Sequence, residues 1–309
     1  MKSEAETINV DIDYVFSPKA IRDRAEEIFA LTMRGDTGFI YHREKLAGVV
    51  DFVIQVIRKN YPNLQVPFHS RWGHFNAGKI NRVARLHDRL AGLNPLEKAR
   101  TKIDLAVVSV LLDAGAGTKW QYTEEPRKSY GRSEGLAIAS LSMFISGAFS
   151  SRPGQLQADS AALKKITAAD LKRHFQVSAQ NPLIGVEGRA QLLNGLGQLV
   201  ENRELFSNGR PGDILNRLLK KYPKKIPATA ILRAVLEDFG PIWPGRIHSN
   251  GVNLGDVWYY PKLDTLVPFH KLSQWMTYSL LEPIIDAGIE VTGVSEMTGL
   301  PEYRNGGLM

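Results

Sequence analysis

The sequence predicts a mainly α-helical fold, and three observations predict it. Apolar residues recur at helical spacing in several windows, residues that start and stop helices bracket those windows, and the clearest hairpin signal is a short one near residue 250. The chain has 309 residues, of which 43% are hydrophobic and 23% charged, so it has the length and composition to bury a globular core. We expect a flexible arm over residues 1–16, then one compact unit over 17–309 with lobes at about 17–160 and 161–309.

The expected helices of the first half are defined by their ends and their apolar faces. Ser17 before Pro18 is typical of a helix start, and Gly35 can end that helix. Further helices are expected over about 43–59, 96–113 and 133–146, with an irregular connector over 118–131. The helix over 96–113 is apolar on nearly all sides in its second half, which predicts burial. The helix over 43–59 has one apolar face, formed by Leu46, Val49, Val50, Val53, Ile54 and Ile57.

Three signals organise the second half. Thr167 and Asp170 have the spacing of a capping box, and residues 185–199 form an amphipathic helical pattern. Asn250 followed by Gly251 suits the two positive φ positions of a type I′ turn, which predicts a hairpin over 247–254. Apolar residues over 266–287 predict a long helix, interrupted near its end by a proline. The fold class is therefore mainly α with a small β element.

The composition excludes several classes of protein. The chain has no cysteine, which excludes disulfides, thiol catalysis and cysteine metal sites. No stretch approaches the roughly 20 apolar residues of a membrane-spanning helix, so we expect no membrane partner. The polar N-terminus lacks the features of a signal peptide, which makes the cytoplasm the default location. The net charge of +7 favours anionic partners, but no basic stripe interleaved with aromatic residues supports nucleic acid over a phosphorylated small molecule.

No standard catalytic signature is present: the chain has no His-Glu-x-x-His, no Gly-x-Ser-x-Gly and no Walker loop. Four clusters of polar and aromatic residues are the candidates instead. In the first, Asp113 emerges from the buried helix into a glycine-rich run, with Arg132 and Glu134 near it in sequence. The glycines would let a ligand approach the backbone, and a plain helix C-cap is the alternative explanation.

The second cluster lies over 67–75 and contains His69, Arg71 and Trp72. It has no clear period, which is typical of a loop that lines a site, and histidines packed among aromatic residues are the alternative. The spacing of His69 and His74 does not bring two ligands onto one helical face, so we expect no metal site and no metal cofactor.

The third cluster, 268–275, contains His270, Lys271, Gln274 and Trp275. Lys271 and Gln274 lie three residues apart, so they share one face of a helix. That polar face, with an aromatic residue beside it, is typical of a pocket wall, and a solvated surface is the alternative.

The fourth cluster, 300–307, contains Glu302, Tyr303 and Arg304. A carboxylate, an aromatic ring and a guanidinium in so few residues suit a ribose or phosphate site. The alternative is an exposed loop in which the two charged residues pair with each other.

At these clusters the sequence resembles the uracil catabolism protein 4 family. The resemblance is carried by the stretches VPFHSRWGHFNAG, IDLAVVSVLLDAGAG, RSEGLAIASL, FQVSAQNPLIGVEGR, RPGD, GPIWPGR, LVPFHKLSQWMTYSLLEP and TGLPEYRNGGL. It implies a role in degrading uracil through a ribosyl intermediate, with a ribosylated or phosphoribosylated urea-type compound as the partner. The family's sequences continue beyond this last stretch, so the resemblance leaves open whether the pocket is complete at Met309.

The half of the chain from Ile166 onward is also similar, more weakly, to the queuosine-salvage nucleosidases, which are helical N-glycoside hydrolases related to DNA glycosylases. The shared order is ITAADLKRHFQ, NPLIGVEGRAQLLNGLG, FHKLSQ and PEYRNGG. This resemblance implies a DNA-glycosylase-like, two-lobed helical bundle. It also implies that the run beginning at Glu302 takes the place of an Asp-Tyr-Arg motif, with Lys271 and Gln274 at the matching lysine and glutamine. One departure is Ser279, which stands where an acidic residue is expected.

The two resemblances together imply N-glycoside hydrolysis, which builds positive charge on the sugar ring. Glu302 would stabilise that charge, and Asp113 would protonate the leaving nitrogen or activate water. A 5′-phosphate would be held by Arg304, Lys271 and Arg71. No metal or redox cofactor is required by this chemistry. The walls of the pocket would be Trp72, Trp243 and Trp275.

Other classes of function stay open at this point. The chain is alternatively a non-enzymatic ligand-binding or partner protein of the uracil pathway, or an enzyme of other chemistry such as amide hydrolysis. A nucleic-acid glycosylase or binder is a further alternative, suggested by the net charge and the glycosylase-like order of motifs.

Overall fold

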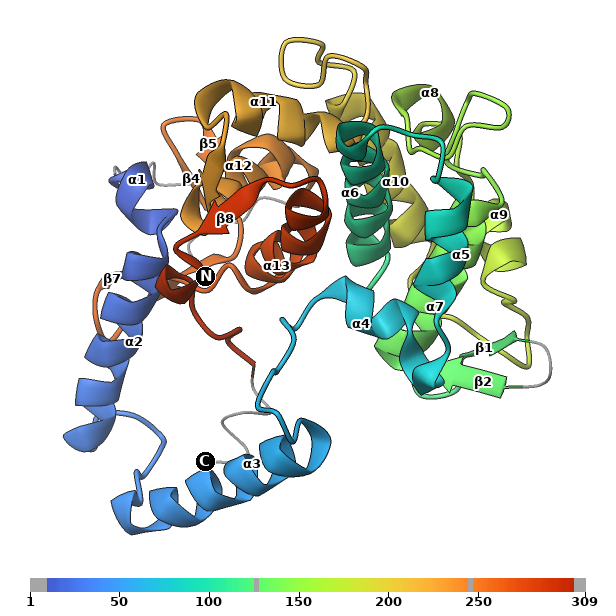
Figure 1. Cartoon of the computed structure of the whole chain (residues 1–309). Coiled ribbons are helices and arrows are strands. Elements are labelled where there is room, and N and C mark those ends of the chain that lie inside the picture. The colour runs from blue at the N-terminus through green and yellow to red at the C-terminus, as the bar shows by residue number, and fades with distance from the viewer. Residues whose placement is uncertain (1–9, 125–127, 244–246, 303–309) are drawn as a thin grey trace. The chain divides into compact units, whose positions relative to one another are not determined.

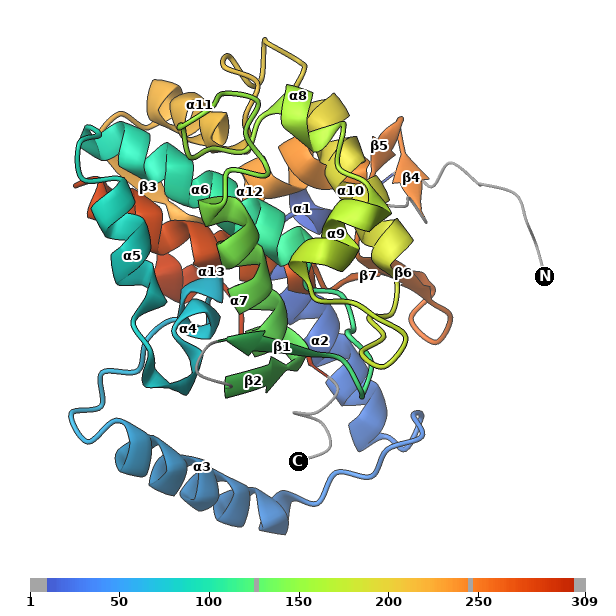
Figure 2. The same ribbon diagram turned by 90° about the vertical axis from the view of Figure 1, so that its right-hand side faces the viewer.

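The computed structural model describes residues 10–124, 128–243 and 247–302, and most of them lie in helices (Figures 1 and 2). The predicted mainly α class is therefore confirmed, while the closer likeness to helical DNA glycosylases stays a prediction. The helices are α1 (Ile12–Val15), α2 (Pro18–Met33), α3 (Leu46–Asn60), α4 (Arg71–Phe75), α5 (Arg82–Arg89), α6 (Pro95–Leu111), α7 (Arg132–Ile145), α8 (Ser160–Leu163), α9 (Ala168–His174), α10 (Val186–Leu199), α11 (Ile214–Lys221), α12 (Ala228–Phe239) and α13 (Lys271–Asp286).

The strands are short and form two-stranded sheets. They are β1 (Gln121–Glu124), β2 (Lys128–Gly131), β3 (Lys225–Pro227), β4 (His248–Ser249), β5 (Val252–Asn253), β6 (Val257–Tyr260), β7 (Thr265–Pro268) and β8 (Glu290–Thr292). Single 3₁₀ turns complete the described elements: η1 (Arg43–Lys45), η2 (Ala77–Lys79), η3 (Pro211–Asp213), η4 (Gly240–Ile242) and η5 (Val294–Glu296).

The chain forms two compact units made of interleaved segments. Unit 1 comprises Met1–His69, Gly245–Gln274 and Ser295–Met309, and unit 2 comprises Ser70–Pro244 and Trp275–Val294. The division into lobes at about 17–160 and 161–309, expected from the sequence, stays a prediction.

The core of unit 2 is built around α6. Asn94 caps this helix by accepting a hydrogen bond from the backbone N–H of Glu97, and proline occupies its first position. Its second half is buried on every side, as the sequence predicts, with Ile103, Leu105 and Val108 fully inaccessible. Burial of each such side chain contributes roughly 1.5–3 kcal/mol. α6 packs against α7 and α10, and the three helices lie together in both ribbon views (Figures 1 and 2).

Two sheets of unit 2 escape prediction from sequence. β1 and β2 pair antiparallel, from Gln121 opposite Gly131 to Glu124 opposite Lys128, so the irregular connector expected over 118–131 is wrong. The strands are short and mostly polar, and they lack the apolar alternation that identifies a half-buried strand. β3 and β8 pair in parallel although 65 residues separate the paired Lys225 and Glu290.

In unit 1, α2 begins as predicted, because the Ser17 hydroxyl accepts a hydrogen bond from the backbone N–H of Ala20. The described part of the expected flexible arm, residues 10–16, contains the helical turn α1, and Val15 is buried. The predicted hairpin is confirmed in β4 and β5, which are joined by Asn250 at φ 49° and Gly251 at φ 79°.

The helix expected over 266–287 is only partly correct. Residues 265–268 form strand β7, which pairs with β6 and packs beside α2, and the helix α13 starts at Lys271. A short apolar run fits a buried strand and a buried helix equally well, so periodicity could not separate them. His270, between the two elements, has φ 47° and turns the chain from strand into helix.

The predicted helix over 43–59 is confirmed as α3 with the preceding turn η1. None of its residues is buried among the described residues, although one face is apolar. Across the described part of the chain, no helix combines the length and hydropathy that a membrane crossing needs.

Candidate functional site

The residues singled out from the sequence divide between the two units. Unit 1 contains His69, His270, Lys271, Gln274 and Glu302. Unit 2 contains Arg71, Trp72, Asp113, Arg132, Glu134, Trp243 and Trp275. Tyr303 and Arg304 lie outside the described residues.

In unit 1, two motifs that are 31 residues apart in sequence meet in an ion pair. The Lys271 ammonium, at the first position of α13, donates a hydrogen bond to the Glu302 carboxylate. The backbone N–H of Lys271 in turn donates to Oδ2 of Asp256 at 3.2 Å, which fixes the start of the helix. The Lys271 and Glu302 side chains are 44% and 26% exposed, so the pair is open to a ligand in solution.

Gln274 anchors the segment that carries Glu302. Its side chain is fully buried, and its Oε1 accepts from both the backbone N–H and the hydroxyl of Thr298, at 3.3 and 2.8 Å. Its Nε2 donates to the carbonyl of Phe269 at 3.3 Å. Gln274 is therefore a positioning residue in this arrangement, since its side-chain amide is bonded to the protein on both sides.

His270 is buried and held by neighbours in unit 1. Its Nε2 lies 2.9 Å from the carbonyl oxygen of Val15, and the ring of Phe16 stands edge-on to it with centroids 5.7 Å apart. Burial lowers the pKa of His270, so the neutral ring is favoured. These contacts explain its place in the fold by packing, and its role in binding substrate stays a prediction. His69 is exposed at the end of the first segment of unit 1.

In unit 2, Arg71 is a fully buried cation at the start of α4. Its Nε donates to the Ser109 hydroxyl at 2.6 Å, its Nη1 donates to the carbonyl of Ser133 at 3.2 Å, and Nη1 lies 3.3 Å from Oδ1 of Asp113. Burial lowers the pKa of Arg71, and the charges of Asp113 and Glu134 oppose that shift. Its Nη2 has no hydrogen-bond partner among the described residues. The guanidinium is therefore partly unsatisfied.

Asp113, which pairs with Arg71, follows α6 in a loop that is fixed by hydrogen bonds from other side chains. Its Oδ2 accepts from the Ser133 hydroxyl at 3.1 Å, and its side chain is 8% exposed. The buried guanidinium of Arg189 donates to the carbonyls of Leu112 at 3.0 Å and Ala114 at 2.8 Å. The loop is thus fixed to α10, and the proposed catalytic role of Asp113 stays a prediction.

The tryptophans of the second and third clusters, Trp72 and Trp275, are buried within unit 2. Trp72 donates from Nε1 to the carbonyl of Ser279 at 2.8 Å, and the ring of Trp275 lies 5.5 Å from the Arg71 guanidinium. Ser279, where the nucleosidase resemblance expects an acid, accepts from the backbone N–H of Arg71 at 2.9 Å and donates to the carbonyl of Trp275 at 2.9 Å. Ser279 donates a hydrogen bond here, which an ionised carboxylate at this position could not do.

The remaining candidates of unit 2 are more exposed. Arg132 and Glu134 begin α7 with exposed side chains, and Arg132 has φ 50°. Trp243 is half-buried after η4. Of these residues, Glu134 of the first cluster interacts electrostatically with Arg71 of the second cluster.

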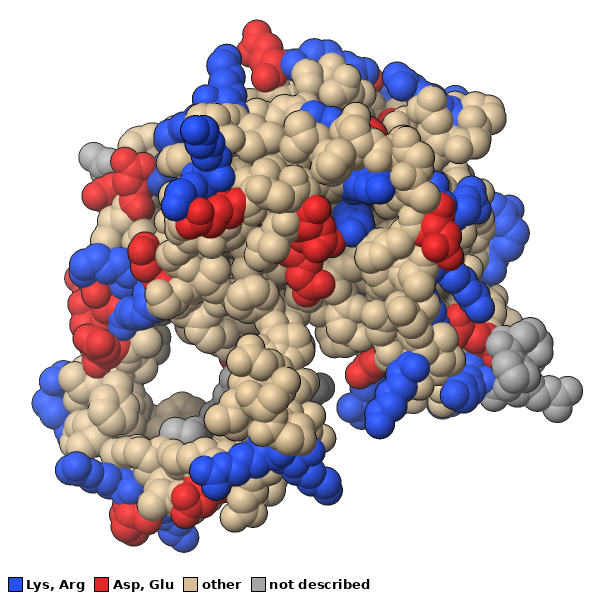
Figure 3. Space-filling view, in the orientation of Figure 1, with Lys and Arg blue, Asp and Glu red and all other residues tan. Residues whose placement is uncertain are grey.

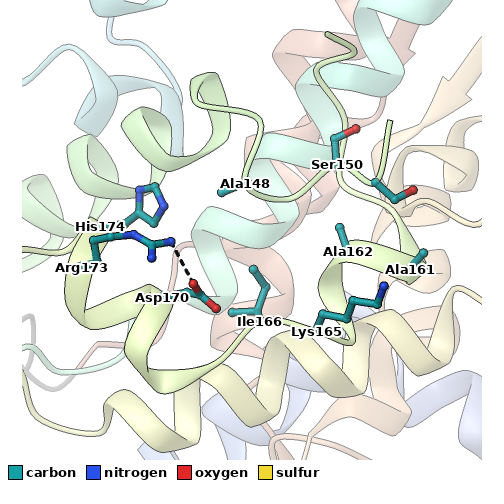
Figure 4. A pocket seen from close by; sticks show the side chains of 10 residues that line it. Ala148, Ser150, Ala161, Ala162, Lys165, Ile166, Asp170, Arg173 and His174 are labelled. Atoms are coloured by element: carbon teal, nitrogen blue, oxygen red, sulfur yellow. Dashed lines mark hydrogen bonds and ion pairs between the residues drawn. The ribbon is translucent and has the colours of Figure 1, made fainter. Parts of the chain in front are cut away.

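Unit 2 also has two open pockets that the sequence did not indicate. The first is lined by Ala148, Ser150, Ser151, Ala161, Ala162, Lys165, Ile166, Asp170, Arg173 and His174 (Figure 4). The second is lined by Lys172, Val177, Ser178, Ala179, Pro182, Leu183, Val186 and Glu187. None of the predicted site residues lines either pocket. The residues of the first pocket form no compact motif, because they come from a loop and two short helices.

Two features of the charged residues bear on the metal and nucleic-acid alternatives. Within the described ranges, no three His, Asp or Glu side chains converge as metal ligands. Figure 3 shows lysine and arginine interspersed with acidic residues on the visible face, without a continuous basic stripe. A groove that tracks a nucleic-acid backbone needs such a stripe.

Comparisons with known proteins cover most of the chain. The sequence model of a family described as "Protein of unknown function (DUF1688)" matches residues 14–309. The chain is 44% identical over 279 residues to "Protein urg3" of Schizosaccharomyces pombe, an alignment that covers 87% of this chain and 68% of that protein. It is 37% identical over 332 residues to "Uracil catabolism protein 4" of Lachancea kluyveri, with 98% of this chain and 76% of that protein covered.

Proposed function

The chain belongs to the DUF1688 family of proteins of unknown function, and from its similarity to a uracil catabolism protein we propose that it is an enzyme of uracil breakdown. The family resemblance expected from the sequence is confirmed by these matches. The activity we propose is hydrolysis of the N-ribosyl bond of a ribosylurea or its 5′-phosphate. Water adds to the anomeric carbon, the carbon–nitrogen bond breaks, and the products are urea and free ribose or ribose phosphate.

The observation that carries this proposal is the ion pair of Lys271 and Glu302. Cleavage of an N-glycoside develops positive charge on the sugar ring, and a carboxylate opposite that charge lowers the barrier. The structure places the Glu302 carboxylate beside the Lys271 ammonium, and a carboxylate is the group that this role needs. Gln274 fixes the segment before Glu302 through Thr298, so the carboxylate is held by a rigid support.

The test is release of ribose or ribose phosphate from ribosylurea and from its 5′-phosphate by the purified protein. We expect turnover by the wild type and a fall in kcat/KM of about 10²–10³-fold in Glu302→Gln, which keeps the shape and removes the negative charge. Glu296→Gln is the matched control, because Glu296 is an exposed carboxylate in the same terminal segment of unit 1. Its rate should equal that of the wild type.

Each other outcome changes the proposal in a defined way. Equal rates for Glu302→Gln and the wild type would remove Glu302 from the mechanism. Saturable binding of both compounds without ribose release would favour the ligand-binding alternative. Release of ammonia while the ribosyl bond stays intact would favour amide hydrolysis.

A further inference from the structure

The first pocket of unit 2 is open and has a mixed lining of small apolar and charged side chains, which the proposed enzyme activity does not use. It lies between the loop after α7, the helix α8 and the helix α9 (Figure 4). Its volume is about 370 Å³, within the range of roughly 300–1,000 Å³ that is typical of small-molecule sites. A ligand larger than a single small ion therefore fits it.

The pocket is already formed by the protein, without rearrangement. Asp159 fixes the wall by accepting from the backbone N–H of Ser151 at 2.7 Å and from that of Ala162 at 3.1 Å. These two bonds join the loop after α7 to the first turn of α8. The walls carry small side chains, Ala148 and Ala161 among them, which leave the space unfilled. A rigid, unfilled site reduces the entropic cost of binding.

The lining has more positive than negative charge. Asp170 is committed to the capping box of α9, where it accepts from the backbone N–H and the hydroxyl of Thr167, at 3.1 and 2.7 Å. It also pairs with Nη2 of Arg173 at 2.9 Å. The side-chain ammonium of Lys165 has no ion pair or hydrogen bond among the described residues, whereas its neighbour Lys164 pairs with Glu201. Two cations thus face one carboxylate that is already engaged.

His174 adds a polar group without a charge near neutral pH. Burial and the nearby Arg173 lower its pKa, in that order, so the neutral ring is favoured. A neutral imidazole offers one donor and one acceptor to a ligand. No aromatic residue other than this histidine lines the pocket, so a nucleobase has little to stack on.

We propose that this pocket binds a phosphorylated sugar or polyol, with the phosphate on Lys165 and the hydroxyls toward Asp170, Arg173 and His174. In Figure 4, Lys165 and Arg173 stand on either side of Asp170, so an extended ligand meets the unpaired ammonium at one end. An ammonium is a common phosphate partner, and a guanidinium that bonds a carboxylate through Nη2 has further N–H donors for hydroxyls. A bare phosphate would leave those donors unused.

The experiment is calorimetric titration of the full chain with glucose 6-phosphate, glucose and inorganic phosphate at constant ionic strength. A hexose phosphate is used because it is not a product of the proposed hydrolysis. We expect glucose 6-phosphate to bind most tightly, and Lys165→Ala to weaken it by about tenfold or more. Lys164→Ala is the matched control and should bind like the wild type, because Lys164 pairs with Glu201.

A second variant tests the cavity itself. Ala161→Leu adds bulk at an exposed position of α8 that lines the pocket, so it should block binding without disturbing the core. Three results would overturn the proposal: no binding of glucose 6-phosphate, equal affinities in Lys165→Ala and the wild type, or an equal loss in Lys164→Ala. Inorganic phosphate binding as tightly as glucose 6-phosphate would reject the polyol part. These readouts do not depend on hydrolysis, so they stand apart from the proposed function.

Discussion

Buried charged side chains in unit 2 differ in how completely they are partnered. Arg189 is buried and donates to several backbone carbonyls. Asp238, on α12, is almost as inaccessible, yet only its Oδ1 has a partner, the Arg217 guanidinium at 2.8 Å. Its Oδ2 has no hydrogen bond within the described residues. An incompletely partnered buried carboxylate is easier to protonate than an exposed one.

Asp238 should make the stability of the protein depend on pH. Burial, with a smaller effect of Glu237, raises its pKa from 3.8 to about 7 against the opposing charge of Arg217. Between these two pKa values the folded state holds the proton while the unfolded state releases it. The contribution of Asp238 to stability is therefore present at low pH and is lost as the pH rises through about 7. Between pH 5 and pH 8 we expect the free energy of unfolding to fall by roughly 2–4 kcal/mol more in the wild type than in Asp238→Asn.

Urea unfolding at each pH measures this difference. Glu237→Gln is the control, because Glu237 is exposed on the same helix and should leave the pH dependence nearly unchanged. Parallel curves for the wild type and Asp238→Asn would contradict the prediction.

At the same scale, the sequence singled out candidate residues but did not indicate which side chains they contact. Lys271 and Glu302 were selected through family motifs, and their pairing across 31 residues has no signature in spacing. Asp113 was visible because a polar residue followed an apolar helix, but its partner Arg71 came from another cluster. Lys165 gave no signal, because an unpaired surface lysine is recognised only when its surroundings are known.

Among the elements of unit 2, α6 and η3 form a closely packed junction. Asp104 on α6 is fully buried and accepts from the backbone N–H of Gly212 at 2.7 Å, from that of Ala158 at 3.1 Å and from Nε of Arg210 at 2.8 Å. The turn η3 therefore lies directly against the helix. A Cβ at Gly212 would come within 2.4 Å of the carbonyl oxygen of Arg100, so only glycine fits.

Gly212→Ala should lower the free energy of unfolding by about 2 kcal/mol or more, because the two backbones must separate. Gly188→Ala on α10 is the matched control. A Cβ there meets nothing within 4 Å, and replacing a helical glycine by alanine should stabilise the protein by roughly 0.5–1 kcal/mol. Chemical denaturation of both variants should give changes of opposite sign, and a neutral Gly212→Ala would refute the close approach.

Elements whose signals are local could be predicted, and those that depend on distant partners could not. Ser17, Thr167 and Asn250 each act within a few residues, and the helix starts and the hairpin that they predict are found in the structure. The pairing of β3 with β8 has no local signal, since neither three-residue strand is stable without the other. The burial of the apolar face of α3 also depends on tertiary contacts, which periodicity cannot predict.

At the scale of the whole molecule, each unit is assembled from segments that are far apart in sequence. In unit 1, Arg22 on α2 donates from Nη1 to the carbonyl of Glu296 at 2.7 Å and from Nη2 to those of Ser295 and Met297. The segment after Ser295 is therefore held by a helix from the start of the chain as well as by Gln274.

Arg22→Ala should loosen this segment without unfolding the protein. A hydrogen bond to a charged group contributes about 1.5–3 kcal/mol, so the backbone amide of Thr298 should exchange with solvent about tenfold faster or more. Hydrogen exchange read by mass spectrometry measures this rate. Lys19→Ala is the control, because Lys19 is an exposed residue of the same helix whose ion pair is with Asp23. Unchanged exchange at residues 295–302 in Arg22→Ala would show that the other contacts are sufficient.

The interleaving of the two units also determines the order in which a nascent chain can complete them. Unit 2 needs β8 for its parallel sheet, and unit 1 needs the residues after Ser295, so neither unit is complete until the ribosome has translated these segments. Until then α6 and its apolar partners have emerged without the strand that finishes their unit. The chain therefore cannot complete one unit well before the other, as it would in the domain-by-domain folding during synthesis that is common in large chains.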